Sequence, residues 1–171
     1  RNVQQSLARE EKEGAGRPAL KSWMAAHPKI SIGTFAEAAA HALLLVNATS
    51  GSGAMEALKA AGDANLKGKA MLDISNPLDF SKGFPPSLTV CNTDSLGEEL
   101  QRAFPELKVV KGLNTLTCFL MVAPRQLPGE HHIFLCGNDP GAKQEVRELL
   151  SSFGWADNEM IDLGDITNAR G

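Results

Sequence analysis

Residues 43–58 read LLLVNATSGSGAMEAL, and this stretch decides which fold the chain is expected to adopt. The continuous apolar run at residues 43–46 has the character of a buried parallel strand. A loop rich in serine and glycine follows the run, and residues 54–61 then have a helical pattern. A strand, a glycine-bearing loop and a helix in this order are typical of a phosphate-binding turn in a dinucleotide-binding domain.

The glycines of this loop match the dinucleotide fingerprint only in part. The fingerprint is G-x-G-x-x-G with an acidic residue about 20 positions later. Gly51 and Gly53 supply the first two glycines and Asp73 supplies the acid, but Glu56 replaces the third glycine. A glutamate there would hinder close helix packing and repel a pyrophosphate. Two βα units also precede the loop, so the sequence favours an ordinary turn capped by one of three hydroxyls, those of Thr49, Ser50 and Ser52.

Outward from this stretch, strands and helices alternate over nearly the whole chain. Strand patterns are present at residues 29–35, 43–49, 69–75, 87–91, 108–115, 132–137 and 160–166. Helical patterns are present at residues 19–26, 37–42, 54–61, 96–104 and 140–153. This alternation predicts an α/β fold, Rossmann-like and doubly wound, with a mainly parallel sheet. One domain is expected over residues 1–171, truncated at its first βα unit and incomplete at both ends.

Local signals mark several of the expected helix ends. Thr34 precedes the helix at 37–42, and Asp94 or Ser95 precedes the helix at 96–104. Asp139 followed by Pro140 is a cap and a first-turn proline. The last helix then carries an apolar face and ends at Gly154; the face consists of Val146, Leu149, Leu150 and Phe153.

Composition narrows the class of protein. The chain has 171 residues, of which 43% are apolar and 22% charged, so one domain with a real core is expected. The net charge of −3 argues against nucleic acid or an anionic membrane as the main partner. No apolar run is long enough to span a bilayer, and the polar N-terminus resembles no signal peptide. Cys91, Cys118 and Cys136 form no C-x-x-C pair, so a reducing cytoplasm is the expected location.

Five segments together are more specific than the opening loop. They are LLLVNATSGSGAMEAL, KAMLDISNPLDFSKGFPPSL, NTDSLGEELQRAFPELKVVKGLNT, HHIFLCGND and IDLGDITNARG. In this order they resemble the NADPH-dependent coenzyme F-420 reductase family over essentially the whole chain. The most specific pieces are Asp73-x-x-Asn76-Pro77-Leu78, Lys111-x-Leu113-Asn114-Thr115 and Gly164-Asp165-Ile166.

The resemblance implies an oxidoreductase that transfers hydride between NADP(H) and a second redox cofactor. The acceptor would be the 5-deazaflavin coenzyme F-420, a flavin or another small molecule, and a homodimer is an open alternative to a monomer. A variant of the family carries the same domain on a membrane ferric reductase. The family's opening strand and G-x-G-x-x-G loop have no counterpart in this sequence. A non-catalytic or truncated nucleotide-binding module therefore remains an alternative, and the missing strand is expected to come from sequence outside these residues or from a partner chain.

The resemblance also implies which residues bind the cofactor. Arg1 would lie at the tip of the family's second strand and pair with the 2′-phosphate of NADP, although a solvated terminal arginine is the plain alternative. Three groups of residues follow the next strands: Asn47, Ala48 and Thr49 beside the ribose and pyrophosphate; Asn76 and Pro77 at the border of the nicotinamide; and Leu113, Asn114 and Thr115 beside it. The alternative for the first group is a strand-end cap for the turn at residues 50–53, and for the second group it is a purely structural turn. Asn114 is the strongest candidate because an amide can donate to and accept from the nicotinamide carboxamide at once.

No catalytic side chain or metal site is predicted. Direct hydride transfer between two bound rings needs positioning and a dry cleft more than an acid or a base. His131 and His132 are adjacent, so on a strand they would point to opposite faces. With Cys136 they do not make a four-ligand zinc site. Lys111 is expected to pair with an acid.

Overall fold

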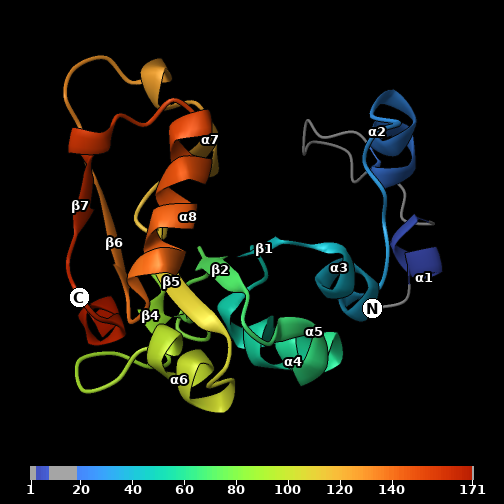
Figure 1. Cartoon of the computed structure of the whole chain (residues 1–171), viewed down its shortest axis with the longest axis horizontal. Coiled ribbons are helices and arrows are strands. Elements are labelled where there is room, and N and C mark those ends of the chain that lie inside the picture. Colours follow the sequence, from blue (N-terminus) through green and yellow to red (C-terminus); the bar gives the residue numbers. More distant parts are fainter. Residues whose placement is uncertain (1–2, 8–18, 171) are drawn as a thin grey trace.

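The computed structural model describes residues 3–7 and 19–170, and Figure 1 shows the arrangement of their elements. Two short helices, α1 (Val3–Leu7) and α2 (Leu20–Ala26), lie apart from the sheet, beyond helix α3 (Phe35–His41). Arg1, the residue predicted to bind the 2′-phosphate, lies outside the described residues.

The described residues form one main sheet with the strand order β1-β2-β5-β6-β7. The strands are β1 (Leu44–Asn47), β2 (Ala70–Asp73), β5 (Lys108–Gly112), β6 (Ile133–Gly137) and β7 (Met160–Asp162). β1, β2 and β5 run parallel, β6 is antiparallel to β5, and β7 is parallel to β6. The mainly parallel α/β sheet confirms the predicted fold class.

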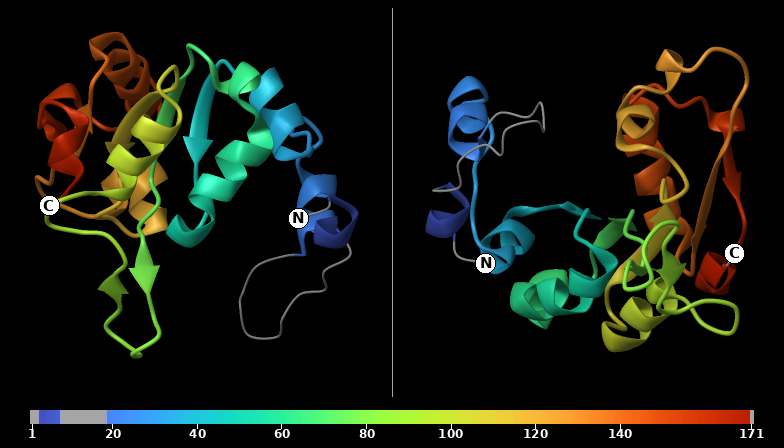
Figure 2. Two further views of the ribbon diagram at one scale, coloured as in Figure 1. Left: turned by 90° about the horizontal axis from the view of Figure 1, so that it is seen from below. Right: turned by 180° about the vertical axis from the view of Figure 1, so that it is seen from behind.

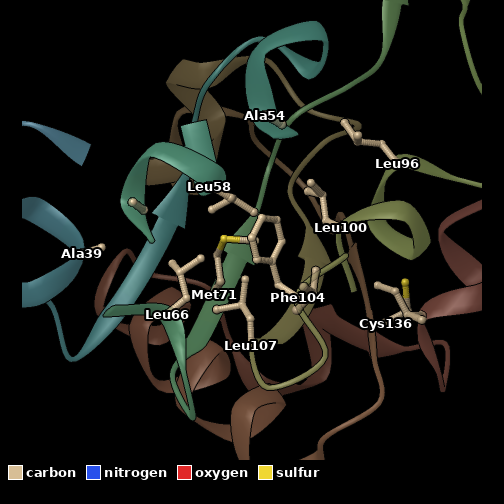
Figure 3. Packing of buried hydrophobic residues seen from close by; sticks show 13 residues of the cluster. Ala39, Ala54, Leu58, Leu66, Met71, Leu96, Leu100, Phe104, Leu107 and Cys136 are labelled. Carbon is tan, nitrogen blue, oxygen red and sulfur yellow. The ribbon is translucent and has the colours of Figure 1, made fainter. Parts of the chain in front are cut away.

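Helices cover both faces of this sheet, as a doubly wound fold requires. One face packs against α4 (Gly51–Ala61), α5 (Asp63–Leu66), α6 (Leu96–Ala103) and the short helix η3 (Ile166–Arg170). The other face packs against α8 (Pro140–Ser152), which contacts β2, β5 and β6. Figure 3 shows the first core, where Phe104 and Met71 lie among Leu58, Leu66 and Leu107.

The remaining elements connect these layers. A small hairpin of β3 (Leu78–Asp79) and β4 (Ser87–Leu88) follows β2 and extends away from the main sheet (Figure 2). Helix α7 (Cys118–Val122) and the short helix η1 (Pro124–Gln126) lie between β5 and β6, and η2 (Asp157–Glu159) precedes β7. Among the described residues, no helix is long and apolar enough to cross a membrane.

Three of the predicted caps are confirmed. The Thr34 hydroxyl accepts a hydrogen bond from the backbone N–H of Glu37, whose carboxylate in turn accepts from Thr34. The Ser95 hydroxyl caps α6, and the Asp139 carboxylate caps α8, whose first residue is Pro140. In contrast, α4 begins three residues earlier than predicted, and Ser50 at its N-cap makes no side-chain cap bond. The prediction that a hydroxyl caps this helix is therefore wrong for Ser50, the residue at the N-cap position.

Near the N-terminal side, the strand predicted at residues 29–35 is wrong, and the strand predicted at residues 43–49 forms without the expected burial. Residues 30–34 form no strand, because no neighbouring strand lies alongside them among the described residues. Three residues of the run at 43–46 belong to β1, but they are not fully buried: Leu44 and Leu45 are half-buried and Val46 is 51% exposed. Leu43, just before the strand, is 92% exposed. β1 pairs with β2 on one side only, so it is an edge strand of the described sheet.

An ion pair near the C-terminal side gives the fold a predictable response to acid. The Arg125 guanidinium holds the pKa of Glu159 down at about 2, well below its ordinary value of 4.5. A carboxyl whose pKa is lowered by folding stabilises the fold above the unfolded value, and that contribution is lost as the pH falls. We expect the loss between about pH 4.5 and about pH 2. Urea unfolding of wild type, Glu159→Gln and Arg125→Met across this range checks it; equal slopes with pH in all three proteins would contradict it.

Candidate functional site

The predicted site residues gather at the carboxyl ends of β1, β2 and β5. Asn47, Asp73 and Lys111 are register partners across these three strands, and all three are buried. The carboxyl ends of parallel strands are where open α/β sheets bind their ligands. The sheet therefore brings the three predicted groups of residues to one edge.

Asp73 is the centre of the hydrogen-bond network at this edge. Its Oδ1 accepts from Asn47 Nδ2 at 2.8 Å and from the Ser75 hydroxyl at 2.7 Å. Its Oδ2 pairs with Lys111 Nζ at 2.9 Å. Asp73 is 0% exposed and Lys111 is 6% exposed, so both charges are inside the protein. Lys111 pairs with an acid as predicted, and Asp73 is not free to bind a ribose as the fingerprint would require.

Asn47 uses both ends of its side-chain amide inside the protein. Its Nδ2 donates to Asp73, and its Oδ1 accepts from the Thr49 hydroxyl at 2.7 Å. Ala48, between them, is exposed. A ligand at this strand end would therefore meet the Ala48 backbone and methyl group before the Asn47 side chain.

Asn76 and Asn114 hold the ends of β2 and β5 together. Asn76 Nδ2 donates to the backbone oxygen of Asn114 at 2.7 Å, and Asn114 Nδ2 donates to Asn76 Oδ1 at 3.3 Å. The preceding residue, Leu113, has a φ of 60° although its side chain is buried. This left-handed backbone is costly for a branched residue. It ends β5 at Gly112, three residues before the predicted strand end, and turns Asn114 towards Asn76.

Gly51 has a role that the sequence did not reveal. A Cβ on Gly51 would lie 2.2 Å from the backbone oxygen of Asn76 and 2.7 Å from Pro77 Cα. Only glycine therefore lets the first turn of α4 pack directly on the turn at residues 76–77. Glu56, at the place of the third glycine, is exposed and pairs with Lys59 at 2.8 Å. The start of α4 at Gly51 thus supports the candidate site by packing against the turn at residues 76–77.

Cavities lie beside these strand ends. The first measures about 730 Å³ and is lined by Val3, Ile32, Gly33, Thr34, Phe35, Ala48, Thr49, Ser50, Gly53, Glu56 and Ala57. A second of about 290 Å³ is lined by Lys111, Asn114, Thr115, Phe134, Leu135, Cys136, Leu163, Asn168 and Ala169. Asn76 and Pro77 line a smaller cavity of about 40 Å³, which Lys111 and Asn114 share. Every described residue of the predicted set except Asn47 and Leu113 lines one of these three cavities.

The sulfur and carboxylate groups of this region do not assemble a metal centre. Within residues 3–7 and 19–170, no three His, Cys, Asp or Glu side chains lie close enough to hold a metal ion. Burial raises the pKa of the Cys136 thiol to about 11, so it stays protonated at neutral pH. Cys136 therefore acts as a small apolar residue of the core.

The sheet order defines a Rossmann-like α/β protein, and the polar side chains beside cavities at its carboxyl edge form a candidate ligand site. The chain belongs to the F420-dependent NADP reductase family. It is 52% identical to a proposed F420-dependent NADP reductase from Arthrobacter sp. FB24, with a TM-score of 0.89. The match covers 98% of this chain and 73% of that one. The predicted family membership is confirmed.

More distant relatives share a shorter part of the chain. The F420-dependent NADP reductase of Methanocaldococcus jannaschii is 30% identical over 106 residues, which are 61% of this chain and 46% of that protein. Metalloreductase STEAP3 of Rattus norvegicus is 29% identical over 106 residues. The matched part spans only 19% of the length of that metalloreductase. No protein-family model matches the chain.

Proposed function

We propose that this chain binds NADP(H) at the carboxyl edge of its sheet and belongs to an oxidoreductase that transfers hydride between NADP(H) and a second redox cofactor. The observation that carries the proposal is the 52% identity to the Arthrobacter protein over nearly the whole chain. The names of two relatives, an F420-dependent NADP reductase and a metalloreductase, make coenzyme F-420 the first candidate redox partner and a metal complex the second. A flavin is a further candidate, and the redox partner is a small molecule in each case.

The side chains at this edge support a nicotinamide cofactor. Among the described residues, Asn114 Oδ1 has no hydrogen-bond partner, so it can accept from the amide of a nicotinamide carboxamide. Thr115 is exposed beside it. The Ala48 backbone and Thr49 line the larger cavity, which has room for the ribose and pyrophosphate. NADP(H) would carry the hydride. The chain's own residues would bind and orient the cofactor and exclude water from it.

We also propose a cytoplasmic location, and the three cysteines are consistent with it. Cys91, Cys118 and Cys136 are free thiols, which is the state that a reducing cytoplasm maintains. A nucleotide-binding module without catalysis is the second candidate, because these 171 residues contain no complete G-x-G-x-x-G loop. The two candidates differ in turnover and agree in binding.

Two assays on the full-length protein separate these candidates. NADPH and NADH are titrated by fluorescence, and NADPH oxidation is then followed with the deazaflavin, flavins and ferric chelates in parallel. We expect tighter binding of NADPH than of NADH, and turnover with one acceptor class. Binding without turnover would favour the non-catalytic module. No binding of either nucleotide would contradict the cofactor proposal.

Asn114→Ala tests the residue that we place beside the nicotinamide. We expect hydride transfer to fall by about tenfold, the factor that corresponds to one lost hydrogen bond of about 1.4 kcal/mol. The unfolding midpoint should change little because Asn114 is only half-buried. Asn158→Ala, an exposed asparagine in η2, is the control. Equal rates in the two variants would remove Asn114 from the site.

A further inference from the structure

The buried ion pair at the carboxyl edge is connected to the predicted nicotinamide end of the site. Lys111 Nζ pairs with Asp73 and also donates to the backbone oxygen of Ser75. Ser75 donates back to Asp73 through its hydroxyl at 2.7 Å and its backbone N–H at 3.2 Å. Three hydrogen bonds to one pair of charges thus fix the turn after β2. Its next residue is Asn76, which holds Asn114.

The pair is a costly way to fill space. Taking two charges out of water carries a desolvation penalty that their attraction often fails to recover, and apolar residues of similar volume frequently serve as well. Met71 and Val109, two positions earlier on the same strands, are buried apolar residues. Stability alone therefore does not explain charges at the ends of β2 and β5. Hydrogen-bonded charges do supply fixed geometry that apolar residues lack.

The geometry extends to the third strand. Asp73 also accepts from Asn47, whose Oδ1 holds Thr49 beside the larger cavity. One carboxylate therefore connects the ends of β1, β2 and β5. The ammonium of Lys111 donates to Asp73 and to Ser75, and through these two residues it is connected to the Asn76–Asn114 pair.

We propose that Asp73 and Lys111 are positioning residues, which set the Asn76–Asn114 pair and Thr49 in the geometry that receives the cofactor. The inference rests on the proposed binding of NADP(H) at this edge. One consequence does not depend on that binding. Without the Asp73–Lys111 ion pair, the side-chain amides of Asn76 and Asn114 should lose their fixed arrangement in the ligand-free protein.

Two double variants of the full-length protein test this inference. Asp73→Leu with Lys111→Met removes the charges and their hydrogen bonds and fills a similar volume with apolar side chains. Asp73→Asn with Lys111→Gln removes the charges and keeps groups that can accept from Ser75 and donate to its backbone oxygen. The first readout is the side-chain amide NMR signals of Asn76 and Asn114 in ligand-free protein. The second is the kcat and KM for NADPH.

We expect both double variants to fold. The Asp73→Asn, Lys111→Gln variant should be close to wild type in both readouts. The Asp73→Leu, Lys111→Met variant (the apolar variant) should shift or broaden the side-chain amide signals of Asn76 and Asn114. Its kcat should fall by about a hundredfold with little change in KM, because a misplacement of about 1 Å can have an effect of that size. Unchanged amide signals in the folded apolar variant would overturn the inference. Shifted signals in a protein whose wild type binds no NADPH would support the positioning and refute the proposed function. If the apolar pair does not fold, Ser75→Ala gives the same readouts with a smaller change, and unaltered signals there would overturn the inference as well.

Discussion

Gly51→Ala is expected to destabilise the protein by about 3 kcal/mol, the upper end of the range for inserting one carbon into a packed interior. The added Cβ would lie 2.2 Å from the backbone oxygen of Asn76. Backbone atoms cannot rotate away as a flexible side chain can, so either α4 or the turn at residues 76–77 must move. Because Asn76 holds Asn114, the same substitution should also lower the kcat with NADPH.

Gly53→Ala is the matched control for this prediction. It lies two residues further along the same helix, where the nearest atom to an added Cβ is the movable Ser50 hydroxyl at 3.2 Å. Alanine is favoured over glycine inside a helix by about 1 kcal/mol, so this variant should be neutral or slightly stabilised. Urea unfolding of both variants gives the comparison. Equal losses of stability would show that the helix tolerates neither substitution and that close packing on Asn76 is not the cause.

Lys111→Met is expected to cost about 3–5 kcal/mol of folding free energy. The substitution leaves the Asp73 carboxylate, which is 0% exposed, without its cation. Asn47 and Ser75 can still donate to it, but these neutral donors do not replace a full charge. The variant should unfold at clearly lower urea concentration than the wild type.

Adding Asp73→Leu to Lys111→Met should recover much of this loss, since no unpaired charge then remains. A double-mutant cycle built from urea unfolding measures the coupling between the two residues. As the control pair, Lys67 and Glu106 form an exposed ion pair on the surface. Removing Lys67 should change stability by less than about 1 kcal/mol. A similar loss for Lys111→Met and Lys67→Met would contradict the importance of burial.

The elements that the sequence predicts well depend on neighbours in the chain. Thr34, Ser95 and Asp139 cap helices through bonds that span three residues. The apolar face of α8 is equally local, and Val146 and Leu150 are fully buried as its spacing predicts. Such features are visible in the sequence because the same segment contains both the cause and the partner.

The features that the sequence misses depend on contacts between distant segments. Val46 belongs to an apolar run typical of a central strand, yet the residue is half exposed, and β1 pairs with only one strand among residues 3–7 and 19–170. Gly51 meets Asn76 across 25 positions of sequence, and nothing in its own segment indicates that contact. The sequence predicts that Lys111 pairs with an acid, but only the register of β2 and β5 identifies Asp73 as the partner.

The site itself divides in the same way. The resemblance to the reductase family selects residues 47–49, 76–77 and 113–115, and the structure gathers them at one sheet edge. Sequence patterns alone do not distinguish residues that face a cavity, such as Ala48, from residues that support them, such as Asn47. That distinction depends on which side-chain atoms are already bonded inside the protein.

The other predictions for this site depend on whether NADP(H) binds at the carboxyl edge of β1, β2 and β5, as we propose. The most direct test is an NMR titration of the isotope-labelled full-length protein with NADPH, with residue-specific assignments. We predict saturable shifts of the backbone amides of residues 47–49, of Asn76 and of residues 113–115. Shifts confined to other surfaces, such as α8 and β7, or no shifts at saturating NADPH, would contradict the claim.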